Sequence, residues 1–404
     1  MADRSPVHQA VILVGGRGTR LGGLTDATPK PLLPCGDRPF LAWVLRELTR
    51  FGIENVLLLT GYLGDKVEQA LPRIRQTLPK PLGITCVWEA EPAGTGGALF
   101  NARAQLAERF LLCNGDSWLD CNLARLIVDA DCDPAETVGR MLLRRLSDAG
   151  RYGVVETEGD HVTAFRERPT SDSAEAASAG TINAGIYLLD RHVLSEISPF
   201  CSLERDVLPT LAARGSLRGT TAEGYFIDIG IPDDLARAQQ ELPARLRRPA
   251  VFIPQQLVIE REAASGDATA LTRFRPGAAS ALRHFSETGW HVFLLVEPRT
   301  GVSSGRDPIL RAMPISGVCA ALRAEGAVVD DVCRLGVALA FPDGKGETGV
   351  SSLANTMMRW ELDPQRCRLV GDTSTAPFTA ETSGIPQVRV NSLGELQSIL
   401  PAVA

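Results

Sequence analysis

The sequence lacks several features that mark special classes of protein. No apolar run approaches the ~18 uninterrupted residues of a membrane-spanning helix. The opening segment MADRSPVHQAVILVGG does not have the layout of a signal peptide, so we expect a cytoplasmic protein that binds no membrane. The net charge of −6 leaves no basic surplus, which argues against a general nucleic-acid binder. No repeat of 20–50 residues is visible, which argues against a solenoid.

Paired cysteine motifs are also missing. The chain has nine cysteines, an odd number, and none of them forms a CxxC pair. This distribution predicts reduced, mostly buried thiols and argues against a structural zinc site. What remains is an ordinary globular composition, with 404 residues of which 44% are hydrophobic and 22% charged. That length suggests two or three domains.

Apolar runs of strand length alternate with helical patterns in the first part of the chain. We expect a helix over Pro39–Gly52, where apolar residues recur at helical spacing. The expected strands are Gln9–Val14, Asn55–Thr60, Ile84–Glu89 and Phe110–Cys113. Strands separated by crossover helices predict a mostly parallel α/β sheet.

The pattern is richer in strands from about residue 137 to 230. A small, polar segment, Thr170–Gly180, predicts a surface loop, and Pro232–Arg248 predicts a closing helix. The strands expected in this part are Thr137–Leu146, Tyr152–Glu158, His161–Arg166, Asn183–Leu189 and Gly224–Asp228.

A second α/β pattern begins after the basic segment RLRRP, which we interpret as a linker. It contains expected strands at Ala250–Ile253, His291–Val296 and Arg368–Asp372, and a helix near Ala278–Thr288. The sequence therefore predicts two domains, residues 1–245 and residues 249–404.

A glycine-rich motif, GGRGTRL, directly follows the first expected strand, and PKPL follows at residues 29–32. Glycine has no Cβ, so backbone N–H groups can approach phosphate oxygens closely, while Arg20 and Lys30 supply positive charge. A tight strand-to-helix turn is the competing interpretation of the glycines alone. The spacing fits neither a dinucleotide fingerprint nor a Walker loop. The residues of this loop predicted to bind a nucleotide are Val14, Gly15, Gly16, Gly18 and Thr19.

Together the two motifs resemble the signature of the sugar nucleotidyltransferases, which join a sugar 1-phosphate to a nucleoside triphosphate and release pyrophosphate. The resemblance continues along residues 9–240 in EPAGTGGA (91–98), NGD (114–116), RYGVV (151–155), ERP (167–169), NAGIY (183–187), SLE (202–204) and FIDIG (226–230). It implies a Rossmann-like domain with a nucleoside-binding loop that includes Gly94 and Thr95. The sequence most resembles the D-glycero-α-D-manno-heptose 1-phosphate guanylyltransferases, and the mannose 1-phosphate guanylyltransferases are the second most similar group.

Nucleotidyl transfer depends on positioning and on neutralising charge at phosphate oxygens. Arg20 and Lys30 are therefore expected to hold the triphosphate and stabilise the pyrophosphate. A Mg²⁺ ion takes hard oxygen ligands, and Asp116 and Asp228 are the natural pair, as the resemblance also implies. An aspartate at a strand end can alternatively be a cap or turn residue. The predicted catalytic residues are Arg20, Lys30 and Asp116.

The resemblance also implies which residues bind the sugar phosphate. It implies contacts from Tyr152, Gly153, Glu167, Arg168, Asn183 and Glu204. Most relatives have lysine where this chain has Arg168, and a guanidinium fork is not equivalent to an ammonium group.

Glu89 bears on the choice of base. Relatives that use thymidine or uridine triphosphate have glutamine at this position, five residues before Gly94. An ionised carboxylate only accepts hydrogen bonds. Guanine presents two adjacent donors, N1–H and the 2-amino group, which one carboxylate can accept together. Glu89 therefore favours GTP, and an exposed glutamate at a strand end is the competing interpretation.

Residues 249–390 resemble phosphatases of the haloacid-dehalogenase type, closest to heptose bisphosphate phosphatases, and imply a smaller Rossmann-like domain. The family's DxDG turn reads Pro254-Gln255-Gln256-Leu257 here, and proline cannot attack phosphorus. Glu297 aligns with the second motif, Lys345 with the lysine position, and Asp372 remains in the last motif, where Ser374 and Ala376 replace carboxylates. We therefore expect an inactive domain with a structural or assembly role, or alternatively a regulatory module or a platform for a partner phosphatase.

The leading hypothesis is a GTP-dependent heptose 1-phosphate guanylyltransferase that uses Mg²⁺. A fused phosphatase remnant favours heptose, because such a phosphatase would act one step earlier in heptose activation. Mannose 1-phosphate is the alternative sugar. A noncatalytic sugar-nucleotide sensor or regulatory subunit is the alternative of a different class, although a sensor is expected to have lost some of the charged site residues. A homo-oligomer is a further expected assembly.

Overall fold

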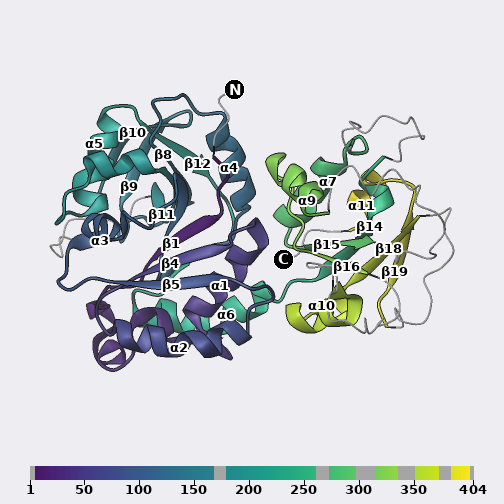
Figure 1. The fold of residues 1–404 in the computed structure, drawn as a ribbon, viewed down its shortest axis with the longest axis horizontal. Helices are drawn as coiled ribbons and strands as arrows, with labels where there is room; N and C mark the ends of the chain where they lie inside the picture. The colour runs from purple at the N-terminus through teal and green to yellow at the C-terminus, as the bar shows by residue number, and fades with distance from the viewer. Residues whose placement is uncertain are drawn as a thin grey trace. The chain divides into compact units, whose positions relative to one another are not determined.

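The computed structural model describes residues 5–167, 179–260, 273–296, 315–334, 351–372 and 384–400. The chain divides into two compact units, Met1–Ala244 and Arg245–Ala404 (Figure 1). Each unit is built around its own sheet, and each is described by itself.

The larger unit contains a nine-stranded sheet of order β5-β4-β1-β6-β11-β8-β12-β10-β9. Its first four members are parallel: β1 (Gln9–Leu13), β4 (Asn55–Thr60), β5 (Gly83–Trp88) and β6 (Arg109–Asn114). All four agree with the expected strands to within one residue at each end. The apolar runs of β1, β4 and β6 are buried on both faces, as interior parallel strands require, whereas the edge strand β5 is partly exposed.

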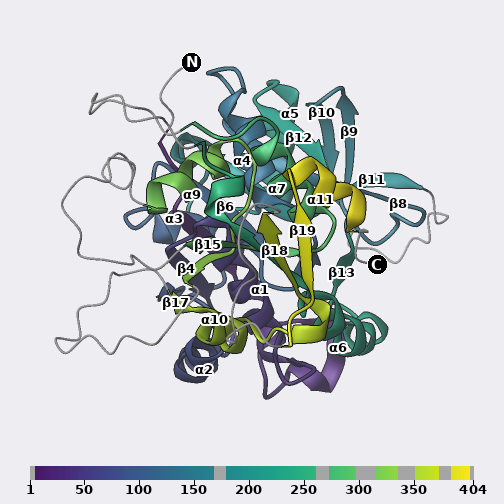
Figure 2. The same cartoon turned by 90° about the vertical axis from the view of Figure 1, so that its right-hand side faces the viewer.

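Antiparallel pairing dominates the rest of this sheet. β11 (Gly180–Asp190) is antiparallel to both β6 and β8 (Gly139–Leu146), and β9 (Val154–Glu158) forms a hairpin with β10 (His161–Arg166). Figure 2 shows β9 and β10 beside β12 (Leu217–Thr221) at one end of the sheet. The sheet is therefore mixed, and the expectation of a mostly parallel one was wrong beyond β6, because β11 runs antiparallel to both of its neighbours and β9 and β10 form a hairpin.

Helices cover this sheet. The expected helix after the first strand is α1 (Phe40–Leu48) followed by a 3₁₀ turn, Thr49–Phe51, and it ends at Gly52 with φ of 78°. Side chains of α3 (Gly94–Ala102) and α5 (Leu208–Ala213) pack with Phe110, Met141 and Tyr187 of the sheet in one apolar core. The remaining helices are α2 (Gly64–Gln76), α4 (Leu123–Asp131) and α6 (Pro232–Leu246). α1, α2 and α6 are grouped at the bottom of this unit in Figure 1.

A separate two-stranded ribbon pairs β7 (Ser117–Leu119) with β13 (Phe226–Asp228). The two strands are antiparallel, with Asp228 opposite Ser117. A further short ribbon pairs β2 (Pro34–Cys35) with β3 (Arg38–Pro39). The register of β7 with β13 places two motifs that are more than a hundred residues apart side by side.

The smaller unit has a six-stranded, fully parallel sheet of order β17-β16-β15-β14-β18-β19. The expected strands are present as β14 (Ala250–Pro254), β15 (His291–Val296) and β18 (Arg368–Asp372), and the expected helix as α7 (Ala278–Glu287). The other elements are β16 (Asp331–Arg334), β17 (Ser351–Ser352), β19 (Gln387–Val390), α9 (Ile315–Ala324), α10 (Leu353–Trp360) and α11 (Leu393–Ile399). This topology confirms a parallel α/β fold for the second half of the chain.

All nine cysteines are free thiols, as expected. Cys35, Cys113, Cys333 and Cys367 are buried, four are half-buried, and Cys132 is exposed just after α4. Four of the nine cysteines are therefore buried, which is fewer than the majority that the sequence predicted.

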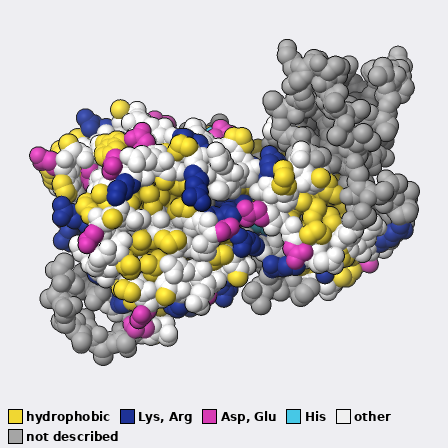
Figure 3. Space-filling model, turned by 90° about the horizontal axis from the view of Figure 1, so that it is seen from below, with side chains coloured by type: hydrophobic (Ala, Val, Ile, Leu, Met, Phe, Trp, Pro, Cys, Tyr) yellow, Lys and Arg dark blue, Asp and Glu magenta, His cyan; other side chains and the backbone are white. Residues whose placement is uncertain are grey.

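Charges of both signs are distributed over the surface. Figure 3 shows Lys and Arg side chains interspersed with Asp, Glu and hydrophobic side chains on the face that it displays. Within the described parts of the chain, none of the helices combines the length and the apolarity that a bilayer crossing needs.

Candidate active site

The site lies where β1 and β6 run side by side. The chain continues from β1 to β4 and β5 on one side of this pair, whereas β6 is followed in the sheet by β11 on the other side. In open α/β sheets, ligands bind beyond the carboxyl ends of the strands at such a switch point. The segments after the two strands touch, because Gly115 N–H donates to the Leu13 carbonyl at 3.0 Å. A Cβ at Gly115 would lie 2.4 Å from that oxygen, so only glycine allows this approach.

The glycine-rich segment after β1 is open. A Cβ at Gly16 would meet no atom within 4 Å, and Gly18 has a left-handed φ of 64°. Thr19 is exposed and begins a 3₁₀ turn, Thr19–Thr25. Val14, by contrast, is buried, and its N–H donates to the Leu59 carbonyl at 3.0 Å. Val14 therefore anchors the loop to the sheet, while the glycines leave its backbone accessible.

Two aspartates and a lysine meet beyond β6. Lys30 Nζ lies 2.6 Å from Asp116 Oδ2 and 3.5 Å from Asp228 Oδ1. The Lys30 side chain is only 7% exposed, so this cation is held inside the protein. Ser117 Oγ donates to Asp116 Oδ1 at 3.1 Å, and Gly230 N–H donates to Asp228 Oδ1 at 2.7 Å. Both carboxylates are therefore oriented by hydrogen bonds from the protein.

Arg20 reaches the same place. A Cβ at Gly230 would lie 2.8 Å from Asp228 Oδ1, 3.2 Å from Lys30 Nζ and 3.3 Å from an Arg20 guanidinium nitrogen. These three groups therefore surround the Gly230 Cα. The structure brings together Arg20, Lys30, Asp116 and Asp228, which the sequence singled out from four separate segments.

The two carboxyl groups have opposite pKa shifts. Burial by itself raises the pKa of Asp116, but Lys30, Ser117 and Arg20 together outweigh burial and lower this pKa below its usual range. Burial, followed by the negative charge of Asp116, raises the pKa of Asp228. Asp116 is thus the more firmly ionised carboxylate of the pair.

The donor set fits a magnesium ion that is completed by a substrate. Among the described residues, no group of three or more His, Cys, Asp or Glu side chains could hold a metal by itself. Mg²⁺ in phosphate-transfer sites takes one or two carboxylates together with phosphate oxygens and water. Asp116 and Asp228 supply two hard oxygen ligands, and the Lys30 ammonium between them shows that the place favours positive charge.

Glu89 lies just after β5, against the backbone of two glycines. A Cβ at Gly61 would lie 2.5 Å from Glu89 Oε1, and one at Gly15 would lie 3.0 Å away. Ala93 N–H donates to Glu89 Oε2 at 3.5 Å. Burial raises the pKa of Glu89, an effect that the Ala93 N–H partly offsets. The carboxylate is therefore partly buried beside the glycine-rich segment rather than free in solvent.

Gly94 and Thr95 begin α3 and pack on the segment that contains Glu204. Gly94 has a φ of 80°, and a Cβ there would lie 2.4 Å from the Cys201 carbonyl oxygen. Thr95 Oγ1 donates to Glu204 Oε2 at 2.6 Å. The predicted nucleotide loop and a predicted sugar-binding residue are thus in direct contact.

The other residues predicted to bind the sugar phosphate come from three neighbouring segments: Tyr152 and Gly153 precede β9, Glu167 follows β10, and Asn183 lies within β11. Asn183 N–H donates to the Gly153 carbonyl at 3.0 Å, and a Cβ at Gly153 would lie 3.0 Å from Glu167 Oε2. The Tyr152 ring packs edge-to-face on Phe226, with centroids 5.5 Å apart. Arg168 lies outside the described residues.

Residues 9–245 match the family model described as nucleotidyl transferase, which covers more than half of the chain. The chain belongs to the nucleotidyl transferase family.

Relatives and solved structures within this family show which members are similar. This nucleotidyl transferase is 33% identical over 237 residues to D-glycero-alpha-D-manno-heptose 1-phosphate guanylyltransferase from Aneurinibacillus thermoaerophilus, an alignment that covers 58% of this chain and 98% of that protein. It is 35% identical over 243 residues to mannose-1-phosphate guanylyltransferase from Mycobacterium tuberculosis, covering 58% of this chain and 65% of that one. The crystal structure of HddC from Yersinia pseudotuberculosis complexed with GMP-PN has a TM-score of 0.50 and 28% identity, and it covers 58% of this chain and 99% of that chain.

Several residues of this nucleotidyl transferase site were not predicted. Tyr187 is buried, and its hydroxyl accepts a 2.5 Å hydrogen bond from Asn183 Nδ2. Ser117 and Gly230 orient the aspartates, and Gly61 seats Glu89. Tyr187 stands within the NAGIY segment, and Ser117 and Gly230 lie next to the aspartate motifs, so proximity to a motif was the available signal.

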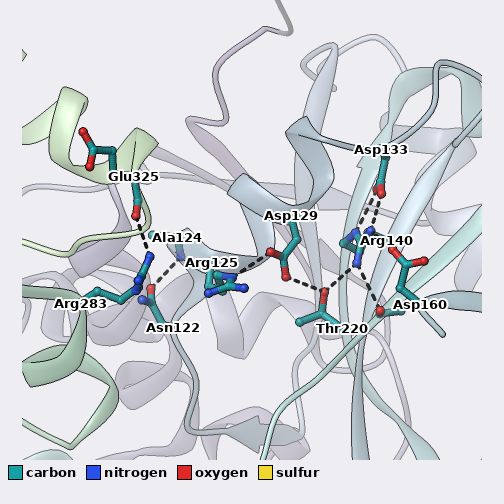
Figure 4. Close-up of polar contacts among 11 residues, drawn as sticks. Asn122, Ala124, Arg125, Asp129, Asp133, Arg140, Asp160, Thr220, Arg283 and Glu325 are labelled. Atoms are coloured by element: carbon teal, nitrogen blue, oxygen red, sulfur yellow. Dashed lines mark hydrogen bonds and ion pairs between the residues drawn. The ribbon is translucent and has the colours of Figure 1, made fainter. Parts of the chain in front are cut away.

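A separate cavity of about 660 Å³ in the larger unit lies around a buried arginine, Arg140. Figure 4 shows the polar contacts of this arginine. Arg140 donates to both oxygens of Asp133 and to Asp160, the Gly219 carbonyl and Thr220 Oγ1. A guanidinium has five N–H donors, and these bonds use all of them. The cluster therefore stabilises the sheet and leaves no donor of Arg140 for a ligand.

In the smaller unit, strand order reverses at β14, between β15 and β18. A ligand site is expected beyond this strand, where Pro254 is buried and is followed by a 3₁₀ turn, Gln255–Leu257. Asp372 ends β18, while Glu297, Lys345, Ser374 and Ala376 lie outside the described residues. The family match ends at residue 245, so the resemblance of this unit to haloacid-dehalogenase-type phosphatases stays a prediction.

Proposed function

We propose that this protein is a sugar 1-phosphate guanylyltransferase that makes GDP-D-glycero-α-D-manno-heptose and pyrophosphate from GTP and the heptose 1-phosphate. The observation that carries the proposal is the meeting of Arg20, Lys30, Asp116 and Asp228 at the switch point between β1 and β6. Such an arrangement of fixed cations and carboxylates suits charge that builds up on transferring phosphate groups.

In the proposed reaction, an oxygen of the sugar 1-phosphate attacks the α-phosphorus of GTP in line, and the bond to pyrophosphate breaks. The glycine-rich segment, open at Gly16, receives the phosphates, and Arg20 and Lys30 stabilise the negative charge of the leaving pyrophosphate. Asp116 and Asp228 would hold Mg²⁺, which supplies further neutralisation of phosphate charge when bound.

Glu89 is proposed to select the base. Its carboxylate is seated between Gly15 and Gly61, next to the segment proposed to hold the phosphates. As an ionised acceptor it can take both N1–H and the 2-amino group of guanine. Thymine and uracil offer one donor beside carbonyl oxygens that repel a carboxylate. The solved relative complexed with GMP-PN supports a guanine nucleotide.

The coverage of the relatives favours heptose over mannose. The alignment spans 98% of the heptose enzyme but only 65% of the mannose enzyme, although the identities are similar. Tyr152, Gly153, Glu167, Asn183 and Glu204 are proposed to hold the sugar phosphate. Mannose 1-phosphate remains the second candidate because of the 35% identity.

The second unit is proposed to have no phosphatase activity. Pro254 ends the strand at the switch point, and a proline side chain can be neither a nucleophile nor a proton donor. A structural or assembly role then accounts for the retained parallel sheet. Hydrolysis of heptose 1,7-bisphosphate by the full chain would refute this part of the proposal.

The test is pyrophosphate release by the purified full chain with Mg²⁺, with GTP, ATP, CTP and UTP each combined with heptose 1-phosphate and mannose 1-phosphate. Release with GTP and heptose 1-phosphate alone is the expected result, and chelation should abolish it. Preference for mannose 1-phosphate would support the proposed nucleotidyl transfer but show that mannose, rather than heptose, is the sugar. Absence of release with every pair would refute the enzyme proposal in favour of a sensor.

A further inference from the structure

The start of α3 is fastened to the segment that precedes Glu204. The Cys201 carbonyl accepts hydrogen bonds from Gly96 N–H at 3.0 Å and Gly97 N–H at 3.2 Å. Cys201 N–H in turn donates to the Ala93 carbonyl at 3.1 Å. A Cβ at Gly94 or Gly96 would lie 2.4 Å from an atom of Cys201. The two segments, about a hundred residues apart in sequence, are therefore in backbone contact.

Thr95 adds a side-chain bond to this contact. Its Oγ1 donates to Glu204 Oε2 at 2.6 Å and accepts a hydrogen bond from Leu203 N–H at 2.8 Å. A threonine hydroxyl has a single hydrogen, and here that hydrogen points to Glu204. The Thr95 hydroxyl is thus already used as donor and acceptor within the protein.

One oxygen of Glu204 is held, and the other is left for a ligand. Oε2 accepts from Thr95 and also from Ser202 Oγ at 2.9 Å. Within the described part of the chain, no hydrogen bond to Oε1 is found. Leu203, the residue before Glu204, packs in the same apolar core as Tyr187, and burial, followed by the negative charge of Glu204, raises the pKa of Tyr187. Asn183 Nδ2 donates to the Tyr187 hydroxyl, so the segments that contain Glu204 and Asn183 both pack around Tyr187.

We propose that Thr95 is a positioning residue for the sugar: its hydroxyl fixes Glu204 so that Oε1 accepts a hydroxyl of the sugar 1-phosphate. This inference rests on the proposed function. Because Thr95 lies in the first turn of α3, directly after Gly94 and shortly after Glu89, the same bond connects the nucleotide side of the site to the sugar side. Thr95 therefore affects the sugar, although its place in the sequence suggests a contact with the nucleotide.

The test compares Thr95→Val, Thr95→Ser and Thr210→Val. Valine has nearly the shape of threonine but neither donates nor accepts, whereas serine keeps the hydroxyl. Thr210 is the matched control in the same part of the unit, because its Oγ1 donates to a main-chain carbonyl, that of Asp206 at 2.9 Å, rather than to a carboxylate. KM for heptose 1-phosphate, KM for GTP, kcat and the melting temperature are measured for each variant.

We expect Thr95→Val to raise KM for the sugar phosphate about tenfold, the effect of losing one hydrogen bond to a charged group. KM for GTP should change less than about twofold by comparison, and Thr95→Ser should restore the sugar KM. A rise in the GTP KM instead would overturn the inference and make Thr95 a nucleotide ligand. Equal loss in all parameters with a lower melting temperature would make the bond purely structural.

Direct binding separates this inference from the proposed function. If the wild-type chain shows no turnover, the proposed function is refuted, and equilibrium dialysis of heptose 1-phosphate still tests Thr95. Binding that weakens about tenfold in Thr95→Val and returns in Thr95→Ser would support the inference. Equal binding by the wild type and Thr95→Val, or no binding to the wild type, would overturn it.

Discussion

Replacement of Glu89 by glutamine should change which base the enzyme prefers. Glutamine has the same shape, but it offers one acceptor oxygen and one NH₂ donor in place of two acceptors. In the position of the Glu89 carboxylate, between Gly15 and Gly61, the amide oxygen can accept a hydrogen bond from only one of guanine's two donors, and the amide NH₂ group faces the other donor. The same amide matches uracil, which presents one donor between two carbonyl oxygens.

The magnitude follows from a lost bidentate contact. Such a pair contributes about 1–3 kcal/mol of discrimination between bases, so kcat/KM for GTP should fall about 10- to 100-fold. Activity with UTP should rise, and the GTP:UTP ratio should fall about 100-fold or more. The assay is initial-rate pyrophosphate release with each triphosphate at saturating heptose 1-phosphate.

Glu91→Gln is the matched control for this change. Glu91 is exposed in the same loop, two residues further on, so the loss of its charge should leave the GTP:UTP ratio unchanged. If Glu89→Gln keeps the wild-type ratio, Glu89 does not contact the base. A parallel loss with all four triphosphates would assign Glu89 to loop structure instead.

Three further predictions concern pH, charge and stability. Burial raises the pKa of Glu89, and guanine binding needs the ionised carboxylate, so kcat/KM for GTP should fall on acidification at a pH above the usual glutamate range. Glu89→Gln should lack this acidic limb of the pH profile. An identical profile for the variant and the wild type would contradict the prediction. Lys30→Met should lower kcat/KM about 100- to 1000-fold by removing a fixed cation, whereas Lys66→Met on α2 should have little effect in the same rate assay. Arg140→Met should lower the free energy of unfolding by about 3–5 kcal/mol, because it removes the Arg140 guanidinium from the buried Asp133 carboxylate. Urea denaturation measures this loss against exposed Arg145→Met, and equal midpoints would show that the cluster is dispensable.

Local sequence determined the strands of the larger unit that carry the site. Asn55–Thr60 and Arg109–Asn114 are short apolar runs that end at turn residues, and such a local pattern is enough to predict a buried strand. β12 was missed, because LRGTT is short, polar and interrupted by glycine, so its pairing with β8 decides its conformation. The glycine-rich segment and the NGD motif follow strands of a parallel sheet, which already predicts that they lie at one edge.

Contacts between distant residues were decided only by the tertiary structure. Lys30 and Asp116 are 86 residues apart, and Thr95 and Glu204 are 109 apart, so no local periodicity brings either pair together. The register of β7 with β13 sets Asp228 beside Asp116, and a shift of one residue would turn the carboxylate to the opposite face. The sequence by itself determined which residue types are present at the strand ends, because strand formation follows local apolar patterning. Packing across the whole unit decides which of those side chains meet and which hydroxyl group hydrogen-bonds to which carboxylate.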